Sequence, residues 1–309
     1  MKLKKIVCLG FNGNELEDNY WSELDKLTEK RVLATGDEVK NHQDGEALLV
    51  KLGSKVGKEV VDAFPNLKYI GMLGTGYGGI DTRYATKKGI TVTNIADYAT
   101  EGVSEFTFAI LLEYLRSIEK AKTQAKQGNY SDDFSGVEIK GKTFGVIGLG
   151  HIGLRTAEIA KAFGADVIYE SFNRKKEAEA KGIKYSDEVL SQADILTVNL
   201  ALNSQTEGYF NATRINTFKK NVIVINPSPM ELFDFKALVD RLKKGDITFM
   251  LDHSDEMTKE QLDCLKPLKN CIIYPPVAYL TVEASKLKKR IYVDNLKNFL
   301  AGKPTNKVN

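Results

Sequence analysis

The sequence has few residues of the kinds that cross-link a protein or anchor it in a membrane. Only three of its 309 residues are cysteines, and the spacing of Cys8, Cys264 and Cys271 matches no metal-binding pattern. We therefore expect them to be reduced packing residues, no metal site, and a cytoplasmic location. No stretch approaches the roughly 18 to 20 apolar residues that a membrane-spanning helix needs.

An excess of charge of one sign is also missing. The 44 basic and 41 acidic residues leave a net charge of +3. Because the lysines are scattered, neither nucleic acid nor a membrane is expected as a partner. The N-terminus has a basic start but only four consecutive apolar residues, 6–9, so we predict a first strand there rather than a signal peptide. The chain is long enough for two domains.

Short apolar runs alternate with helical patterns along the whole chain. This alternation predicts an α/β fold with two doubly wound, parallel-sheet, Rossmann-like domains. One domain is expected to comprise residues 1–97 and 285–309, and the other residues 98–284. Strands are expected at 6–9, 32–34, 47–51, 67–73, 91–94, 143–147, 165–169, 195–199, 222–226, 248–251 and 271–274. Helices are expected at 15–30, 58–64, 82–88, 99–114 with a polar continuation toward 127, 154–163, 175–181, 213–218, 235–244 and 281–300.

The most informative stretch begins with the predicted strand 143–147. Gly148, Gly150 and Gly153 follow it as G-x-G-x-x-G, then come a helix, a second strand and Glu170. In a dinucleotide-binding turn these glycines allow the turn itself, the approach of a pyrophosphate and close helix packing. An acid at the end of the second strand accepts the ribose hydroxyls of NAD and repels the 2′-phosphate of NADP. We therefore predict an NAD site; the alternative is a glycine-rich turn without a ligand.

A positively charged segment directly follows Glu170. Arg174, Lys175 and Lys176 could contact an adenosine phosphate, but we favour a solvated start of a helix, so NAD remains preferred over NADP. The preference for NAD over NADP therefore depends on Glu170.

Several short segments along the chain carry a family resemblance. They are residues 64–70, Gly74-Thr-Gly76 with Ile80-Asp81, Thr93-Asn94, 103–107, 140–143, 193–195, Asn226 with Leu232 and Asp234, Leu251-Asp252, and 301–303. On these segments the chain resembles the D-isomer-specific 2-hydroxyacid dehydrogenase family from end to end. The resemblance implies a cofactor domain inserted into a smaller substrate domain, a site in the cleft between them, and a homodimer that pairs through the cofactor domain and its long helix, 99–114.

The resemblance also implies two sets of binding residues for NAD and a small-molecule substrate. The substrate set is Lys51, Leu52, Gly53, Gly74, Thr75, Gly76, Tyr77 and Tyr98. The cofactor set is Val103, Gly148, Gly150, His151, Ile152, Gly153, Glu170, Asn199, Leu200, Ala201, Asn226, Pro227, Ser228, Asp252 and Pro276. Asp252 is expected near the nicotinamide amide. Lys51 could meet an anionic group or be solvated.

The family's reaction needs a cation for the substrate carboxylate, a histidine to exchange a proton, and a carboxylate to hold that histidine. In this sequence the corresponding positions hold Pro229, Pro276 and Met257. No shift of the alignment supplies the first two, because 221–235 contains no Arg or Lys and 254–309 contains no His. We therefore expect an atypical catalytic set.

Four other side chains near these motifs are candidates for proton transfer. They are His253, Glu256, Tyr274 and Tyr279, and each could instead be a packed or solvated residue. Three functions remain open: an NAD-dependent oxidoreductase acting on a small carbonyl or hydroxy substrate, a different reaction on the same scaffold, and a catalytically inactive NAD-binding regulatory protein.

Overall fold

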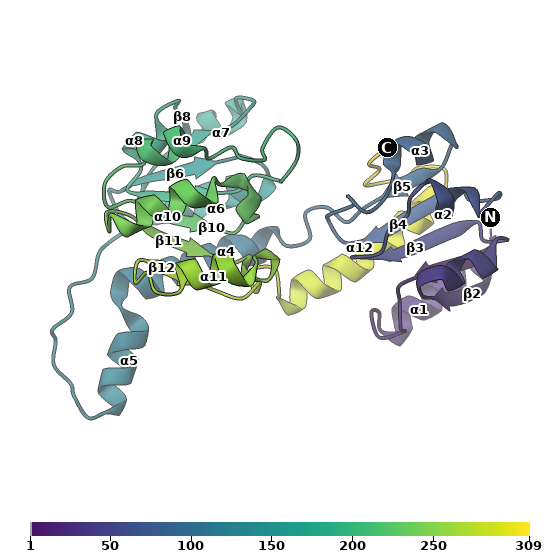
Figure 1. The fold of residues 1–309 in the computed structure, drawn as a ribbon, viewed down its shortest axis with the longest axis horizontal. Helices are drawn as coiled ribbons and strands as arrows, with labels where there is room; N and C mark the ends of the chain where they lie inside the picture. The colour runs from purple at the N-terminus through teal and green to yellow at the C-terminus, as the bar shows by residue number, and fades with distance from the viewer. Residues whose placement is uncertain (1) are drawn as a thin grey trace. The chain divides into compact units, whose positions relative to one another are not determined.

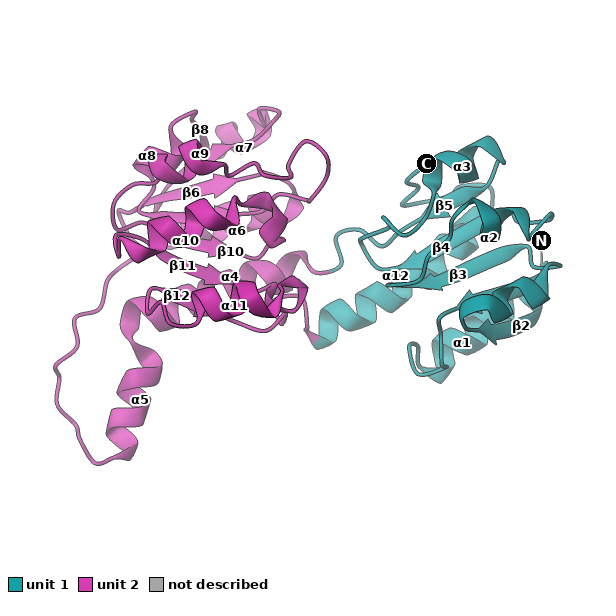
Figure 2. Ribbon diagram, in the orientation of Figure 1, with its two compact units in different colours: residues 1–98, 282–309 teal, residues 99–281 magenta. Residues whose placement is uncertain are grey.

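The computed structural model describes residues 2–309 and divides into two compact units. Unit 1 comprises Met1–Tyr98 and Val282–Asn309, and unit 2 comprises Ala99–Thr281 (Figure 2). The second boundary lies before the expected residue 285, because the last helix, α12 (Val282–Leu300), packs along its length on unit 1. That unit 1 binds the substrate and unit 2 the cofactor remains a prediction.

Unit 1 is built on a five-stranded parallel sheet in the order β2-β1-β3-β4-β5 (Figure 1). Its strands are β1 (Leu3–Leu9), β2 (Thr28–Ala34), β3 (Ala47–Lys51), β4 (Tyr69–Leu73) and β5 (Thr91–Thr93). Its other helices are α1 (Asp18–Asp25), α2 (Lys58–Asp62), α3 (Thr82–Lys87) and the 3₁₀ helix η1 (Gly36–His42). Every residue of β4 is buried, as expected for a parallel strand covered on both faces.

The predicted helix at 15–30 is too long. Helix α1 ends at Asp25, and Thr28 already lies opposite Leu3 in the sheet. The segment is polar because β2 is an edge strand whose middle residues remain partly exposed. Its sequence therefore lacks the continuous apolar run that marks an inner strand.

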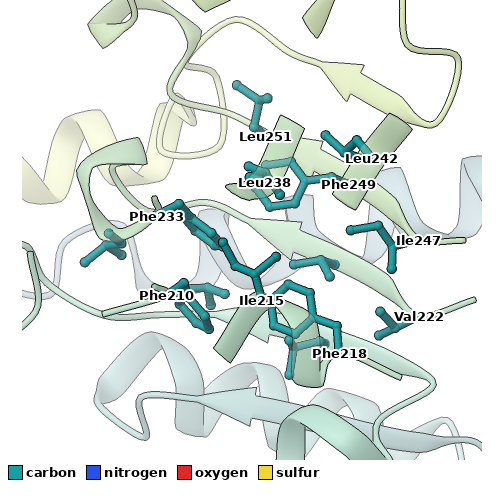
Figure 3. Close-up of a cluster of buried hydrophobic side chains, with 14 of the residues drawn as sticks. Phe210, Ile215, Phe218, Val222, Phe233, Leu238, Leu242, Ile247, Phe249 and Leu251 are labelled. Carbon is teal, nitrogen blue, oxygen red and sulfur yellow. The ribbon is translucent and has the colours of Figure 1, made fainter. Parts of the chain in front are cut away.

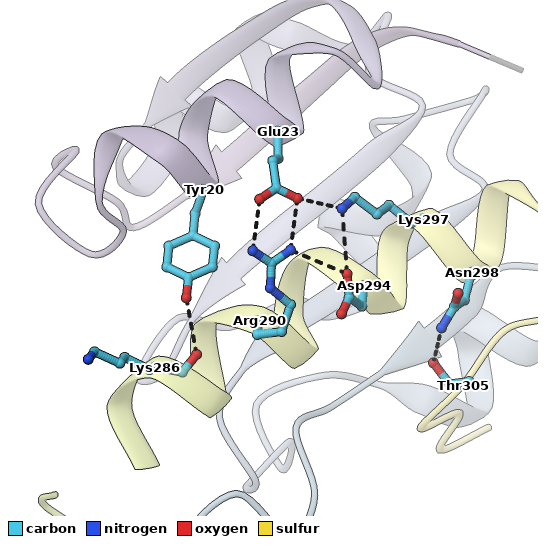
Figure 4. Close-up of polar contacts among 8 residues, drawn as sticks. All are labelled: Tyr20, Glu23, Lys286, Arg290, Asp294, Lys297, Asn298 and Thr305. Atoms are coloured by element: carbon cyan, nitrogen blue, oxygen red, sulfur yellow. Dashed lines mark hydrogen bonds and ion pairs between the residues drawn. The ribbon is translucent and has the colours of Figure 1, made fainter. Parts of the chain in front are cut away.

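Helix α12 returns the chain to unit 1. Tyr292 is buried, and its hydroxyl donates to the carbonyl of Gly71 on β4, 3.3 Å away. Two nitrogens of Arg290 each lie 2.8 Å from a carboxylate oxygen of Glu23 on α1 (Figure 4). The C-terminal helix is thus held by both packing and charge.

Unit 2 is built on a seven-stranded parallel sheet in the order β12-β11-β10-β9-β6-β7-β8. Its strands are β6 (Thr143–Ile147), β7 (Asp166–Glu170), β8 (Lys184–Tyr185), β9 (Ile195–Val198), β10 (Ile223–Asn226), β11 (Thr248–Leu251) and β12 (Cys271–Ile273). Its helices are α4 (Thr100–Arg116), α5 (Ile118–Lys126), α6 (His151–Ala162), α7 (Lys176–Ala180), α8 (Val189–Gln192), α9 (Ala212–Thr217), α10 (Phe235–Lys243), α11 (Lys259–Leu265) and the 3₁₀ helices η2 (Met230–Leu232) and η3 (Ser254–Glu256).

One hydrophobic core of this unit is rich in phenylalanine (Figure 3). The rings of Phe210 and Phe233 stack with centroids 4.4 Å apart, and Phe249 on β11 meets Phe233 edge-on at 5.2 Å. The sequence did not predict β8, α8 or α11. The expected continuation of helix 99–114 breaks at Ser117, which has a positive φ of 49°. None of the helices within residues 2–309 is both long and apolar enough to cross a membrane.

Candidate active site

The glycine turn after β6 contains three glycines with different constraints. Gly148 has a φ of +88°, and a Cβ there would lie 2.6 Å from the carbonyl oxygen of Asn199. A Cβ on Gly153 would lie 2.0 Å from the carbonyl oxygen of Gly148. A Cβ on Gly150 would meet no atom within 4 Å. Gly148 and Gly153 are therefore required by the fold, whereas Gly150 leaves open space at the start of α6.

The predicted cofactor residues of unit 2 gather at one edge of the sheet. The glycine turn follows β6, Glu170 ends β7, and 199–201, 226–228 and Asp252 follow β9, β10 and β11. The carboxyl ends of parallel strands meet at one edge, where α/β proteins bind ligands. Val103 is buried on α4, which packs against α6, and Pro276 follows β12.

Several of these residues have fixed local contacts. Ile152 accepts a hydrogen bond from Ser104 at its carbonyl, and Ala201 accepts one from Thr206 in the same way. Leu200 is buried, whereas the side chain of His151 is exposed at the first position of α6.

An unsatisfied acceptor marks this edge. The side-chain oxygen of Asn199 is buried and has no hydrogen-bond partner in the described part of the chain. A buried polar atom without a partner costs free energy, so such atoms are rare unless a ligand or water meets them. Together with the open space at Gly150 and the N-terminus of α6, this oxygen fits a polar dinucleotide at the edge.

Glu170 is held by two residues that the sequence analysis missed. The Tyr209 hydroxyl donates to its Oε1 at 2.6 Å, and one Arg214 nitrogen lies 2.7 and 2.8 Å from its two oxygens. Burial, and then the neighbouring Glu170 carboxylate, raise the pKa of Tyr209. Neither residue lies at a fixed spacing from the glycine turn, so only the folded sheet brings them to Glu170.

The loop in which the resemblance sets Pro229 against the family's arginine is held by hydrogen bonds. Asn226 is buried and donates to the carbonyl of Ser228 at 2.8 Å, and the Ser228 hydroxyl donates to the carbonyl of Val198 at 3.0 Å. Pro227 lies between them, and Pro229 follows as the residue before η2. No side chain of this loop carries a positive charge.

Asp252 organises the segment that contains Pro276. It is buried, and its Oδ1 accepts the backbone N–H groups of Val277 at 3.0 Å and Ala278 at 3.2 Å. Burial raises the pKa of its carboxyl, and the two backbone hydrogen bonds oppose that rise. Met257, which the resemblance sets against the family's glutamate, is buried in the hydrophobic core and is a packing residue.

Two of the four proton-transfer candidates lie together. Nδ1 of His253 is 3.2 Å from Oε2 of Glu256, within the turn that follows Asp252. The histidine side chain is 23% exposed and that of the glutamate 43%. A histidine paired with a carboxylate is the arrangement that orients an imidazole for proton transfer.

The two tyrosine candidates differ. The Tyr274 hydroxyl donates to Glu113 on α4 at 3.2 Å, and its ring packs edge-on against Phe106. Burial and the Glu113 carboxylate raise the pKa of Tyr274 to about 12. These contacts support the alternative that Tyr274 is a packing residue. Tyr279 is partly buried, and its hydroxyl has no hydrogen-bond partner among residues 2–309.

The predicted substrate residues of unit 1 lie at the carboxyl ends of β3 and β4. Lys51 is paired with Glu15 at 2.8 Å, Leu52 is exposed, and Gly53 has a φ of +91°. Thr75 donates to the carbonyl of Ile95 at 2.9 Å and fixes the turn after β4. In that turn Gly74 is buried while Gly76 and Tyr77 are exposed; Tyr98 lies at the end of the unit's first segment.

Comparisons with known proteins identify the family to which this chain belongs. Residues 108–278 match the family model "D-isomer specific 2-hydroxyacid dehydrogenase, NAD binding domain". A hydroxypyruvate reductase from Blautia hydrogenotrophica is 33% identical, over 99% of this chain and 100% of that protein. The crystal structure of a D-lactate dehydrogenase from Aquifex aeolicus, complexed with NAD and lactic acid, is 25% identical with a TM-score of 0.81 and 96% of each chain covered.

A third similar protein acts on a different class of compound. It is an acyclic imino acid reductase, solved in complex with NADPH and D-Arg, that is 25% identical with a TM-score of 0.82 over 99% of this chain and 100% of that chain. The family match spans more than half of this chain, and the hydroxypyruvate reductase aligns along its whole length. This protein is therefore an oxidoreductase of the D-isomer specific 2-hydroxyacid dehydrogenase family, with NAD as its cofactor.

Proposed function

We propose that the protein is an NAD-dependent oxidoreductase for a small carbonyl or hydroxy substrate, with His253 and Glu256 as its acid–base pair. The observation that carries this proposal is the 3.2 Å contact between the two side chains directly after Asp252. Bound NADH supplies the hydride. His253 gives a proton to the developing alkoxide, and Glu256 holds its imidazole in position.

The surrounding residues support these roles. Asp252 holds the backbone of Val277 and Ala278 and so fixes the segment where Pro276 replaces a histidine. Pro276 cannot transfer a proton, and Pro229 cannot pair with a carboxylate. We therefore expect slow turnover on ordinary 2-oxo acids and propose that the enzyme prefers another small carbonyl or hydroxy compound.

The test is NADH oxidation with pyruvate, glyoxylate, hydroxypyruvate and 2-oxoisocaproate. Losing a positioned acid typically costs about 10²- to 10⁴-fold in rate. His253→Asn should therefore lower kcat by at least about 100-fold while leaving NADH affinity unchanged, and Glu256→Gln should lower it less. His42→Asn, in unit 1, is the matched control and should leave the rate unchanged. Equal rates for His253→Asn and the control would refute the assignment.

An imine is the second substrate class, favoured by the proline at 276. A protonated imine carbon accepts hydride without a separate proton donor, so a site that lacks the usual histidine suits it. The similar imino acid reductase supports including this class. Mixtures of each 2-oxo acid with ammonia or methylamine should then oxidise NADH faster than the acid alone. Rates at about 10 s⁻¹ on a 2-oxo acid alone would show that Pro229, Met257 and Pro276 do not slow the reduction of 2-oxo acids.

The regulatory alternative has its own outcome. Tight NADH binding with no oxidation by any carbonyl or imine would favour an NAD sensor over an enzyme. In that case His253→Asn would change neither the NADH affinity nor the rate of NADH oxidation.

We also propose a homodimer formed through unit 2. Helix α5 has no buried residue, and Ile118 and Tyr130 are exposed at 42% and 84%. A groove of about 830 Å³ in the same unit has a mainly polar lining, in which Tyr114 and Val137 are exposed apolar residues. A second copy would cover such apolar surface. Light scattering at tens of micromolar tests this, and a monomer mass would rule it out.

A cytoplasmic location remains our proposal for the cellular compartment. It is supported by the state of the cysteines, since Cys8, Cys264 and Cys271 form no disulfide.

A further inference from the structure

Unit 1 contains a small cavity between the carboxyl ends of β3 and β4 and the first turns of α12. Its volume is about 260 Å³, and its lining includes Glu15, Lys51, Ser285, Lys288 and Lys289. All of these residues belong to one compact unit, so the cavity is a property of that unit by itself. Three lysines and one glutamate make its lining positively charged.

Two of the three lysines are already neutralised. Lys51 lies 2.8 Å from Glu15, which also accepts the backbone N–H groups of Asn12 and Gly13 at 3.1 and 3.0 Å. Lys289 lies 2.5 Å from Glu17. Glu15 is therefore satisfied and holds Lys51 in place, without charge to spare for a further cation.

The third lysine has no such partner. Among residues 2–309, the Lys288 ammonium has no carboxylate within salt-bridge distance, and its contact is the ring of Tyr98, 5.4 Å from Nζ to the centroid. Lys288 is only partly exposed. Burial, with a smaller effect of neighbouring Lys289, lowers the pKa of its ammonium. An unpaired, half-buried ammonium in a cavity is costly unless an anion meets it.

We propose that this cavity binds the carboxylate of a small substrate and that Lys288 is the cation that holds it. This inference rests on the proposed function, whose substrate is a small carbonyl compound or its imine, and adds that this substrate carries a carboxylate. Ser285, exposed one turn earlier on α12, adds a hydroxyl donor to the same lining.

The size of the cavity limits the substrate class. Ligand pockets usually measure roughly 300 to 1,000 Å³, so about 260 Å³ admits an acid of only a few carbons. Leu52 and Leu73 give the lining an apolar part, which suits a short aliphatic chain beside the carboxylate.

The test uses oxalate, a carboxylate probe with no ketone to be reduced, and neutral oxamide as its counterpart. Full-length protein is titrated with each by calorimetry at constant ionic strength, with and without Lys288→Met and Lys288→Arg. Lys286→Met is the matched control, because Lys286 is exposed on the same helix and does not line the cavity (Figure 4). Thermal unfolding and NADH binding of every variant check that the fold is intact.

We expect wild type to bind oxalate and not oxamide. Lys288→Met should weaken oxalate binding roughly 10- to 100-fold, the usual effect of losing a hydrogen bond to a charged group. Lys288→Arg should retain most of it, and Lys286→Met all of it. No binding in wild type, or equal losses in the Met variants at 286 and 288, would overturn the inference.

This result is independent of turnover. Oxalate binding that depends on Lys288 in a protein that oxidises no NADH would remove the proposed function but keep the anion site. NADH oxidation that is unaffected by Lys288→Met, with no oxalate binding, would remove the anion site alone.

Discussion

Gly150 and Gly153 differ in a way that separates cofactor binding from stability. A side chain at Gly150 meets open space, and the φ of −78° there suits any residue. A side chain at Gly153 meets the carbonyl oxygen of Gly148 at 2.0 Å. We therefore expect Gly150→Val to remove NADH binding from a folded protein and Gly153→Ala to destabilise unit 2.

The two magnitudes follow from these contacts. Gly150 is the residue that caps α6, and valine is a poorer cap than glycine, so Gly150→Val should cost up to about 1 kcal/mol of stability. The overlap at Gly153 requires a backbone shift, and such overpacking costs about 1 to 3 kcal/mol. Each charge-assisted hydrogen bond to a phosphate is worth about 1.5 to 3 kcal/mol. Displacing a pyrophosphate from two of them weakens NADH binding about 100-fold or more.

Calorimetry with NADH and urea unfolding measure both effects. Far-UV circular dichroism is the unfolding probe, because the single tryptophan, Trp21, belongs to unit 1 and does not report on unit 2. Unchanged NADH affinity in Gly150→Val would refute the placement of the pyrophosphate. Unchanged stability in Gly153→Ala would refute the packing argument.

Two further predictions concern charge. Glu170→Gln removes the carboxylate that Arg214 contacts, so the freed arginine should raise NADPH affinity relative to NADH by about tenfold. Paired titrations of both cofactors measure this, with Glu188→Gln, an exposed residue that contacts Gln192, as control. An unchanged preference in Glu170→Gln would contradict the prediction. Hydrogen bonds from Arg290 and Lys297 lower the pKa of Glu23 to about 2 from its ordinary 4.5, so the stability it contributes is complete above pH 4.5 and is lost as the pH falls toward 2. Glu23→Gln should therefore destabilise unit 1 by up to about 1 kcal/mol at pH 7, and Trp21 fluorescence should show this difference shrinking over that range; a difference independent of pH would contradict the ion-pair explanation.

The parallel sheets were predictable because their inner strands are continuous apolar runs. The strands at 47–51, 143–147 and 248–251 begin and end where the sequence predicted. The wrong or missing predictions concern elements without a continuous apolar run. Strand β2 is polar at a sheet edge, β8 is two residues long, and the turn at Ser117 needs a positive φ that no glycine announces.

The candidate site was predictable only where the chain itself brings residues together. The glycine turn and Glu170 belong to one β-α-β segment, so their spacing is local. Tyr209 and Arg214 reach Glu170 from a separate segment, and no periodicity links them to it. Lys288 lies on a helix that follows unit 2 in sequence but packs on unit 1. Contacts of this kind depend on the topology of the chain, which single residues do not reveal.

In our proposal, Pro229 and Pro276 have different consequences for the reaction. We propose that Pro229 stands where the family has its arginine, and the buried, hydrogen-bonded loop around it offers no other cation. Lys288, the cation that we propose for the anion site of unit 1, is a half-buried ammonium without a carboxylate partner among residues 2–309. Pro276 cannot donate a proton, and Asp252 holds the segment that contains it. His253 stands next to Asp252 in sequence and pairs with Glu256. If Lys288 is the cation and His253 the proton donor, the two changes should act separately in the double variant Lys288→Met/His253→Asn. Lys288→Met should raise KM, and His253→Asn should lower kcat. Identical effects of the two single changes on KM and kcat would contradict this division of roles.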